Sequence, residues 1–397
     1  MNNQPKTPKT ENQPLKVALV CDWLTNVGGA EKVLLEIHKL FPNAPIFTSK
    51  YDPQGIDWFK DAEVKTGWLQ IFPAKLRRIL SPLRQLYFSH LDLSEYDLVI
   101  SVTGAEAKSI KFGHQTTHIC YCHVPTQYYW QMYDDYVKDP GFGAFNPIVR
   151  FFFKLFVKPL KKADFQAAQK PTQFVTISEY AGELIQKYYH RDATVIHPPV
   201  ENSTFNRETT EKSPVENFYI TTSRQVTWKR LDLAVKACKK ADRKLLIIGE
   251  GPEHENLKKL AGGSDLIKFL PIMQKDDLKK YLSVAKGFIF PSLEPFGIAP
   301  VEALAVGCPV IAFSEGGALD YIEDGKNGVF FKKQTVDSLV EAIAEFEKLD
   351  FNRDKVAKTA EKFSAERFDA ELRALIEEKC SEVSKAPKTD CKNEKTC

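Results

Sequence analysis

The segment PSLEPFGIAPVEALAVGCPVIA, residues 291–312, combines the end of an apolar strand, a glycine turn and the start of a helix. The first turn of such a helix presents free backbone N–H groups, which bind anions. Glu294 precedes the helix and Glu302 lies inside it, so the two carboxylates can accept hydrogen bonds from two hydroxyl-bearing parts of one ligand. Two glutamates at this spacing also fit a solvated helix face. The glycine turn and the apolar helix favour a site for a phosphorylated, hydroxyl-rich ligand.

The segment SRQVTWKR, residues 223–230, follows another apolar strand. Arg224 and Lys229 can converge on a diphosphate and stabilise it as a leaving group through charge-assisted hydrogen bonds. A solvated cationic surface is the alternative. The chain contains no D-x-D sequence, so no clamp for a divalent metal is evident. We therefore expect neither a metal nor another cofactor.

Three further strand ends carry residues suited to a ligand. Gly28 and Gly29 would let the backbone approach a ligand closely, although a plain tight turn is the alternative. Gly249 opens the turn GEGPE, which lacks the third glycine of a dinucleotide fingerprint. His123 ends the strand THICYCH, so its imidazole should project at the carboxyl edge of a sheet, where structural histidines are also common.

Short β-branched runs alternate with helix-length amphipathic segments along most of the chain. The predicted strands are KVALVCDWL, YDLVISV, THICYCH and QFVTIS, and then NFYITTS, KLLIIG, LIKFLP, GFIFPS, PVIAFS and GVFF. The alternation predicts βαβ units on parallel sheets, and therefore an α/β fold of two Rossmann-like, doubly wound domains. Ligands bind beyond the carboxyl ends of such strands, so we expect the two domains to face each other across a cleft.

Composition and linker signals give the domain boundaries. We expect polar, disordered tails at 1–14 and 384–397, an N-terminal domain at 15–199, a C-terminal domain at 200–363, and a final helix at 364–383 that crosses back to the N-terminal domain.

The 397 residues carry a formal charge of +3, which disfavours a nucleic-acid partner. No run of about 18 apolar residues predicts a membrane span, and the polar N-terminus lacks the apolar core of a signal peptide. Most of the cysteines lie in apolar runs, as buried thiols do in a reducing compartment. These features predict a cytoplasmic protein.

The run E-P-F-G-I-A-P-V-E-A-L-A-x-G-x-P-V-I-A resembles the E-x7-E signature of family 4 retaining glycosyltransferases, which have the GT-B fold. The similarity extends from Val17 to about Phe368, and the motifs occur in the family's order. YCHVPTQYYW, EPFGIAPVEA and GGALDYI are most similar to O-antigen mannosyltransferases of the WbaZ type. The resemblance implies a metal-independent transferase that takes a hexose from a nucleoside-diphosphate sugar.

The resemblance also implies roles for single residues. Glu302 would bind the donor ribose and Glu294 would face the donor sugar. The backbone N–H groups of Phe296, Gly297 and Ile298 would bind the donor sugar and its diphosphate.

Arg224 and Lys229 match the family's S-R-x4-K-R pattern, whose cations stabilise the departing diphosphate. His123 matches the histidine that lines the donor-sugar pocket and stabilises positive charge on the sugar. Pro295 departs from the family, because it has no N–H to donate.

The remaining implied positions lie in loops. Gly28 and Gly29 would lie over the donor phosphates, and Asp22 would be a polar group on the acceptor side. Gly249 would pack by the nucleotide, and Pro271 would lie in the FLPIM turn, whose backbone holds the nucleobase.

Two cationic, aromatic stretches, 72–90 and 142–163, contain no acidic residue. In the second, cations recur at helical spacing beside several phenylalanines, as in an amphipathic helix that contacts anionic lipid on the inner face of the cytoplasmic membrane. A core helix with a solvated Lys/Arg face is the alternative.

The family resemblance implies a retaining hexosyltransferase, and the resemblance to the WbaZ type implies mannose from GDP-mannose as the first choice of donor. The acceptor would be a saccharide, carried on a lipid and destined for a surface polysaccharide. The alternatives are a sugar-nucleotide epimerase or phosphorylase of the same fold, and a non-catalytic nucleotide-sugar binding subunit.

Overall fold

The computed structural model describes residues 15–74, 80–138, 143, 146–200 and 217–385. The chain forms two compact units. Unit 1 comprises residues up to Val175, Ile185–Thr194 and the residues from Leu372 onward, and unit 2 comprises Thr176–Leu184 and Val195–Glu371. Each unit is built on a parallel sheet, as the alternating pattern predicts.

Unit 1 contains a seven-stranded sheet in the order β3-β2-β1-β4-β5-β6-β7. The elements up to the end of this sheet are β1 (Val17–Cys21), α1 (Gly29–Leu40), β2 (Ile46–Thr48), β3 (Val64–Thr66), η1 (Trp68–Ile71), α2 (Ser81–His90), β4 (Leu98–Thr103), η3 (Ala107–Ser109), β5 (Thr117–Cys122), α3 (Tyr133–Lys138), α4 (Asn146–Ala168), β6 (Gln173–Thr176), α5 (Glu179–Tyr189) and β7 (Ala193–Val195). The chain returns from β3 to β4, beside β1, so the topological switch lies between β1 and β4.

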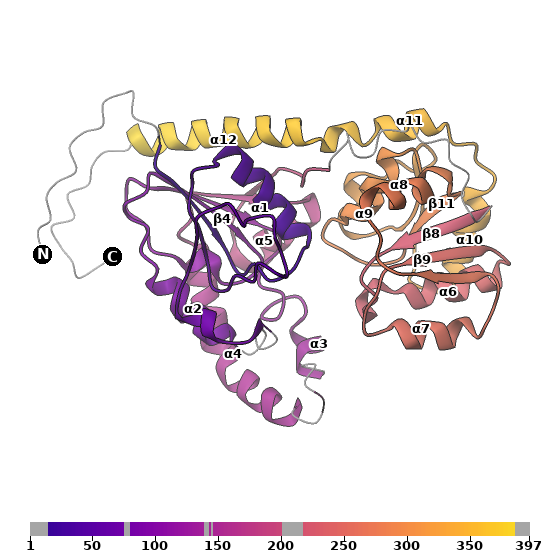
Figure 1. The fold of residues 1–397 in the computed structure, drawn as a ribbon, viewed down its shortest axis with the longest axis horizontal. Helices are drawn as coiled ribbons and strands as arrows, with labels where there is room; N and C mark the ends of the chain where they lie inside the picture. Colours follow the sequence, from indigo (N-terminus) through magenta and orange to yellow (C-terminus); the bar gives the residue numbers. More distant parts are fainter. Residues whose placement is uncertain (1–14, 75–79, 139–142, 144–145, 201–216, 386–397) are drawn as a thin grey trace, which may run out of the picture. The chain divides into compact units, whose positions relative to one another are not determined.

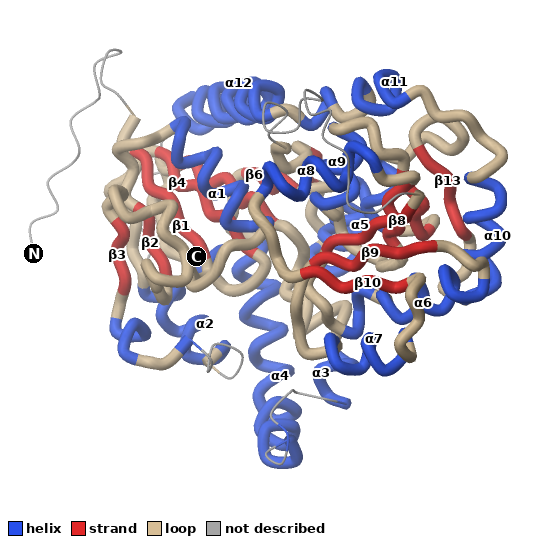
Figure 2. The backbone as a smooth tube through the Cα atoms, turned by 45° about the vertical axis from the view of Figure 1, so that its right-hand side comes forward, coloured by secondary structure: helices blue, strands red, loops and turns tan. Residues whose placement is uncertain are grey.

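Unit 2 contains a six-stranded sheet in the order β10-β9-β8-β11-β12-β13, with its switch between β8 and β11. The remaining elements are β8 (Phe218–Thr222), η6 (Thr227–Lys229), α6 (Leu231–Lys240), β9 (Lys244–Ile248), α7 (His254–Ala261), β10 (Ile267–Leu270), α8 (Lys275–Val284), β11 (Gly287–Phe290), α9 (Ile298–Ala305), β12 (Val310–Phe313), η7 (Gly316–Asp320), β13 (Gly328–Phe331), α10 (Val336–Phe346), α11 (Arg353–Lys358), η8 (Glu361–Phe363) and α12 (Ala365–Lys385). Helices α6 and α7 cover one face of this sheet and α8 and α9 the other (Figures 1 and 2). Each unit is therefore doubly wound.

Burial explains which strands the sequence pattern revealed. All residues of β1, β4 and β5 are buried, because helices cover both faces of the sheet, and these strands read as continuous apolar runs. The pattern missed β2, β3 and β7, which have three residues each. A strand that short has no readable periodicity.

Several expected boundaries fall near or beyond the described residues. Residues 1–14 and most of 384–397 lie outside the described part of the chain, as do residues 201–216, next to the predicted boundary between the two domains. Helix α12 extends to Lys385, so the first two residues of the expected C-terminal tail are helical. Among the described residues, no helix is long and apolar enough to cross a membrane.

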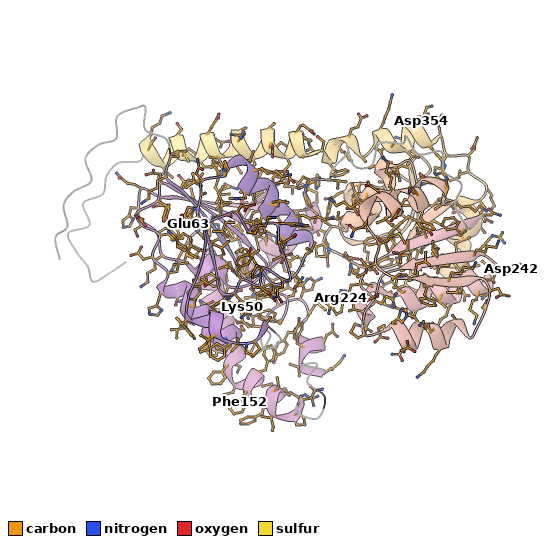
Figure 3. All side chains as sticks on the ribbon, in the orientation of Figure 1. Lys50, Glu63, Phe152, Arg224, Asp242 and Asp354 are labelled. Carbon is orange, nitrogen blue, oxygen red and sulfur yellow. The ribbon has the colours of Figure 1, made fainter. Side chains whose placement is uncertain are left out.

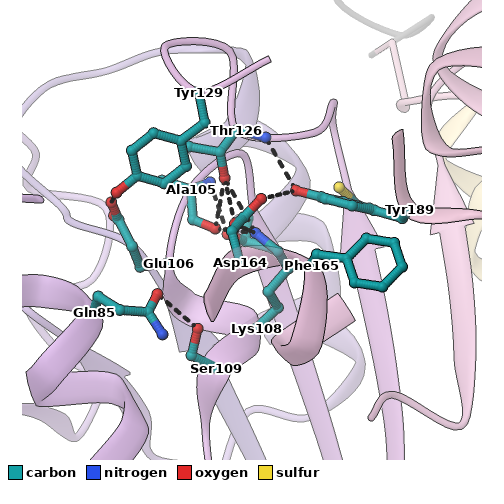
Figure 4. A network of polar contacts seen from close by, with 12 residues as sticks. Gln85, Ala105, Glu106, Lys108, Ser109, Thr126, Tyr129, Asp164, Phe165 and Tyr189 are labelled. Atoms are coloured by element: carbon teal, nitrogen blue, oxygen red, sulfur yellow. Dashed lines mark hydrogen bonds and ion pairs between the residues drawn. The ribbon is translucent and has the colours of Figure 1, made fainter. Parts of the chain in front are cut away.

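Two buried ion pairs stabilise unit 1, and the sequence did not reveal them. The Lys108 Nζ lies 2.6 Å from Asp164 Oδ1, and both side chains are fully buried. Thr126 Oγ1 and Tyr189 Oη each donate a hydrogen bond of 2.8 Å to the same carboxylate (Figure 4). Burial lowers the pKa of Lys108, but the Asp164 charge outweighs it and holds this pKa well above its ordinary value.

The second pair joins Arg84 to Glu106 at 2.8 Å, and both side chains are at least 96% buried. Ser81 and Tyr128 also donate hydrogen bonds to Glu106. Burial raises the pKa of Glu106, but the Arg84 charge and these hydrogen bonds lower it below its ordinary value. The stretch 72–90 was predicted as a cationic surface. Its one described Lys or Arg is instead an internal ion-pair partner.

We expect Asp164→Asn to destabilise the protein by about 3–5 kcal/mol, because it leaves the buried Lys108 ammonium without its counter-charge. Thermal and urea unfolding measure this loss. Lys158→Met on the same helix is the control: Lys158 is exposed, so its loss should change stability by at most about 0.5 kcal/mol. Equal stability of the two variants would contradict the assigned role of the pair.

Candidate functional site

The predicted ligand loops of unit 2 follow the strands around its switch point. Residues 223–230 follow β8, residues 249–253 follow β9, and residues 291–297 follow β11, which pairs with β8. The carboxyl ends of parallel strands lie at one edge of the sheet, so the three loops gather there. Arg224 lies at this end of the unit, and Asp242 lies at the opposite end (Figure 3).

The loop before α9 is held by its carbonyl groups. The Glu294 carbonyl accepts a hydrogen bond of 2.8 Å from the Gly317 N–H. The Pro295 carbonyl accepts one from Ser178 Oγ, and the Phe296 carbonyl accepts one of 2.9 Å from Tyr321 Oη. Three consecutive carbonyls are therefore bound by groups from elsewhere in unit 2. This fixes the peptide planes that lead into the first turn of α9 (Ile298–Ala305), whose N–H groups have no partner within the helix.

Close backbone packing makes glycine necessary around this loop. Gly297 has φ +91°, and a Cβ there would lie 2.6 Å from the Phe290 ring. A Cβ on Gly317 would lie 2.4 Å from both Phe296 Cα and the Pro295 carbonyl oxygen. Any side chain at either position would push the loop away from its support.

The Phe296 side chain anchors the loop from inside the unit. It is 2% exposed and stacks on the His197 ring, with centroids 5.6 Å apart. Tyr321 and Phe363 pack against it edge-on. The backbone N–H of Phe296 was predicted to face the donor, and its side chain adds a structural role that the motif did not reveal.

Lys229 and Glu294 lie together. Lys229 Nζ is 2.5 Å from Glu294 Oε2, and their side chains are 21% and 15% exposed. Ser292 Oγ donates a further hydrogen bond of 2.7 Å to Glu294 Oε1. The structure thus joins two predicted catalytic residues from two different strand ends.

The other two predicted charged residues are placed differently. Arg224 is exposed on the loop after β8, and no contact with a described residue joins it to Lys229 or Glu294. An exposed guanidinium on this loop can still swing toward an anion. Glu302 is half-buried within α9, one turn after the start of the helix.

Gly249 and Pro271 line one pocket of unit 2, with a volume of about 520 Å3. His254, Lys258 and Phe269 also line it, and the rings of His254 and Phe269 pack edge to face at 5.5 Å. Aromatic and amide edges of this kind can hold a planar heterocycle. The two positions are distant in sequence, and the fold brings them to the same cavity.

Gln225 ties this pocket to the basic loop. Its side chain is fully buried, donates to the Gly249 carbonyl at 2.6 Å and lies 2.7 Å from His254 Nδ1. A Cβ on Gly249 would lie 2.2 Å from the Ser223 carbonyl oxygen, which explains why glycine stands there. Sequence reasoning missed Gln225, because a polar residue between two basic ones gives no sign of burial.

In unit 1, Asp22 follows β1 and is buried. Its carboxylate accepts hydrogen bonds from Thr103 Oγ1 at 3.0 Å, from the Gly104 N–H at 2.9 Å and from the Ala107 N–H at 2.8 Å. Burial, together with the Glu106 charge, raises the pKa of Asp22. The carboxylate predicted to face an acceptor is therefore used internally to hold the loop between β4 and η3.

Asp22 and His123 line one pocket of unit 1, with a volume of about 260 Å3, together with Glu31 and Tyr128. The His123 Nε2 atom is buried and has no hydrogen-bond partner among the described residues. Burial lowers the pKa of His123 to about 4, so its ring is neutral at neutral pH. A buried, unpartnered ring nitrogen beside a cavity is suited to hydrogen-bond a ligand.

Gly28 and Gly29 begin α1, as the sequence predicts, with Gly28 at the N-cap position. A Cβ on Gly28 would lie 2.6 Å from Glu31 Oε2, in the first turn of the same helix. The fold places this turn after β1, at the switch point of unit 1.

The two sheets and their loops define an α/β protein with pockets at the carboxyl ends of its strands. Residues 202–363 match the family described as Glycosyl transferases group 1. Mouse (Mus musculus) Alpha-1,3/1,6-mannosyltransferase ALG2 is 23% identical over 402 residues, covering 87% of this chain and 92% of that protein. The GDP-mannose-dependent alpha-(1-6)-phosphatidylinositol monomannoside mannosyltransferase of Mycobacterium tuberculosis is 34% identical over 139 residues, covering 31% of this chain and 36% of that protein.

Solved structures show the same fold. Anabaena HepE in complex with UDP has a TM-score of 0.64 at 17% identity, covering 92% of this chain and 100% of that one. Sucrose-phosphate synthase from Thermosynechococcus elongatus has a TM-score of 0.65 at 16% identity, covering 91% and 98%. The fold is that of the GT-B glycosyltransferases, and within the second half of the chain the sequence matches the group 1 family model.

We expect Tyr321→Phe to loosen the loop before α9, because the Phe296 carbonyl loses its donor. Hydrogen exchange followed by mass spectrometry should show at least about tenfold faster exchange at the Gly317 amide, which donates to the Glu294 carbonyl of the same loop. Tyr219→Phe is the matched control, since Tyr219 Oη also donates from a buried ring, but to Glu347. The same exchange rate at Gly317 in both variants would contradict the role of Tyr321.

The His123 ring should stay neutral from pH 8 down to about pH 5 and take up a proton near pH 4. Because this folded-state pKa lies below the unfolded value of about 6.5, the contribution of His123 to stability is present above that value and is lost as pH falls toward 4. Nitrogen-15 NMR of the histidine rings measures this titration. A His123 midpoint above pH 6 would show that the ring is not buried as described.

Proposed function

We propose that this protein is a retaining glycosyltransferase that moves a hexose from a nucleoside-diphosphate sugar to a saccharide acceptor. The observation that carries the proposal is the Lys229–Glu294 pair beside a loop whose carbonyls are held and whose following helix presents free N–H groups. A cation, a carboxylate and a helix N-terminus together suit a ligand that carries both phosphate and hydroxyl groups.

The chemistry follows from these groups. The bond from the sugar C1 to the diphosphate oxygen breaks, and its electron pair stays on the diphosphate. Lys229 and Arg224 neutralise the charge that develops there. The acceptor oxygen bonds to C1 with retention of configuration, and the proton of its hydroxyl passes to the departing diphosphate. In this scheme the neutral His123 lines the donor-sugar pocket, and Glu294 faces the sugar.

Mannose from GDP-mannose is the proposed donor. Two relatives are mannosyltransferases by name, and one of those names specifies GDP-mannose. We assign the nucleobase to the pocket lined by Gly249 and Pro271, the ribose to Glu302, and the diphosphate to the N–H groups of Phe296, Gly297 and Ile298.

The resemblance to WbaZ-type O-antigen enzymes supports a lipid-linked saccharide acceptor in surface-polysaccharide synthesis. No metal takes part in this proposal, because the cations supply the counter-charge.

Calorimetric titration with GDP, UDP, ADP and dTDP in EDTA tests the donor assignment. We expect micromolar binding of GDP and much weaker binding of the others. Lys229→Ala should weaken GDP binding by about tenfold to a hundredfold, because one charge-assisted hydrogen bond is lost. Lys244→Ala, at the exposed start of β9, is the control and should leave the affinity unchanged.

Glu294→Gln separates binding from transfer. The substitution releases Lys229 from its ion pair, so GDP should bind at least as tightly as to the wild type. Transfer of radiolabelled mannose from GDP-mannose to membrane lipid extract should fall by at least about a hundredfold. If Glu294→Gln keeps full transfer activity, the role of this carboxylate is wrong, and tight binding of UDP instead of GDP would replace the proposed donor.

A further inference from the structure

Helix α4 (Asn146–Ala168) exposes a stripe of large apolar side chains. We define the α4 stripe as Ile148, Phe151, Phe152, Leu155 and Phe156, whose side chains are between 45% and 65% exposed. The spacing of three and four residues places all five on one face of the helix. The first turns of α4 extend away from the sheet of unit 1, and Phe152 lies on that part (Figures 2 and 3). A water-soluble surface rarely carries so many neighbouring phenylalanines without a partner.

A row of lysines borders the stripe. Lys154, Lys158 and Lys162 are spaced by four residues, so they lie in line along one edge. All three are exposed, and none makes an ion pair with a described residue. The helix contains no acidic residue before Asp164, which is fully buried. The border therefore carries an uncompensated positive charge.

The other two cations before Asp164 are engaged within unit 1. Arg150 donates to the Lys138 carbonyl at 2.7 Å. Lys161 lies over the rings of Trp130 and Tyr133, at 5.2 and 4.6 Å from their centroids. Arg150 and Lys161 therefore have partners within unit 1, whereas the three lysines of the row make no ion pair with a described residue.

The second half of α4 is fixed to unit 1. Asp164 binds Lys108, Thr126, Tyr189 and Trp130, the last through a 2.7 Å hydrogen bond from Nε1. Nearer the exposed end, the ring of Phe153 stacks on Tyr133 of α3 at 5.8 Å. The buried network around Asp164 therefore fixes the orientation of the α4 stripe. Helix α4 is already formed, so binding of a partner would not have to include the cost of folding it.

We propose that the α4 stripe inserts into the surface of an anionic lipid bilayer, with Lys154, Lys158 and Lys162 against the headgroups. The apolar face would enter the interface, and the lysine row would lie beside the phosphates, as in an interfacial helix. The charge pattern favours lipid over a second copy of this chain. In an antiparallel stripe-to-stripe pair the lysine rows of the two copies would lie side by side, and α4 offers no free carboxylate to pair with them in either orientation.

The proposal goes beyond the transferase assignment and does not depend on it. Vesicle binding needs neither donor nor acceptor. A failed transfer assay would therefore not contradict the lipid-binding proposal, and a failed vesicle assay would not contradict the proposed nucleotide site. Of the two predicted membrane stretches, the structure supports α4, because the one described Lys or Arg of 72–90 is buried in an ion pair.

Flotation with vesicles tests the proposal. The full chain should bind vesicles of 30% phosphatidylglycerol in phosphatidylcholine, and bind pure phosphatidylcholine vesicles much more weakly. Replacing the three lysines by glutamate should lower the partition coefficient at least about a hundredfold, from about fivefold for each cation removed. The control replaces three exposed lysines of unit 2, Lys348, Lys355 and Lys358, by glutamate. It changes the net charge equally and should retain binding.

A second pair of variants tests insertion. Phe151→Ser with Leu155→Ser should lower binding at least about tenfold while the Tm stays close to that of the wild type, since both side chains are exposed. In Phe152→Trp, lipids brominated in the acyl chain should quench the new tryptophan.

Equal binding of the α4 and control lysine variants would overturn the proposal, and so would unquenched fluorescence at position 152. Sedimentation velocity showing a dimer that Phe151→Ser with Leu155→Ser disrupts, without vesicle binding, would assign the stripe to a second copy instead.

Discussion

The site of unit 2 depends on how three consecutive carbonyl groups are bound. A peptide unit is planar, so a carbonyl that is held in one direction sends the neighbouring N–H in the opposite direction. Gly317, Ser178 and Tyr321 bind the carbonyls of residues 294–296. The same constraint that orders this loop therefore aims the N–H groups entering α9. Proline is compatible with position 295 because its carbonyl accepts the hydrogen bond from Ser178. Its missing backbone N–H means that residue 295 offers no donor to a ligand.

Unit 1 is stabilised by a different interaction, the pairing of buried charged side chains. The short segment from Gly104 to Ser109 is bound by Asp22 through its N–H groups, and it carries both Glu106 and Lys108 into the interior. Each buried charge has an opposite charge within hydrogen-bond distance, without which its desolvation would be prohibitive. The segment links the wall of the His123 pocket to the base of α4. A single rigid loop thus positions both the pocket and the exposed helix.

The two units share one architectural rule. In each sheet the order of the strands reverses beside the first strand, and the loops with chemical groups follow the strands near that switch. Unit 2 places a cation, a carboxylate and a glycine-lined pocket there. Unit 1 places a neutral histidine with an unpartnered ring nitrogen. Groups of this kind suit a sugar bearing a charged leaving group, which the proposed transfer requires.

The sequence alone determined the α/β class, the two sheets and the loops that carry the site. Those features depend on local periodicity and on glycine, which are readable in a short window. Phe296, Gly297 and Lys229 were recognisable because they belong to contiguous motifs. The tertiary structure alone decided that Lys229 pairs with Glu294, since the two residues lie 65 positions apart in the sequence and no local pattern encodes such a contact.

The same limit explains what the sequence misrepresented. Arg84 appeared as a surface cation, because the glutamate that neutralises it lies 22 residues away. Asp22 was predicted as a ligand group, and the sequence did not show that its carboxylate also binds a loop that follows a strand more than 80 residues later. Ser178, Gln225 and Tyr321 lie in the quoted segments QFVTIS, SRQVTWKR and GGALDYI, but no local pattern shows that their side chains bind carbonyl groups. A buried polar side chain needs a hydrogen-bond partner. That partner often lies on a distant segment of the chain, so it can be identified only from the tertiary structure.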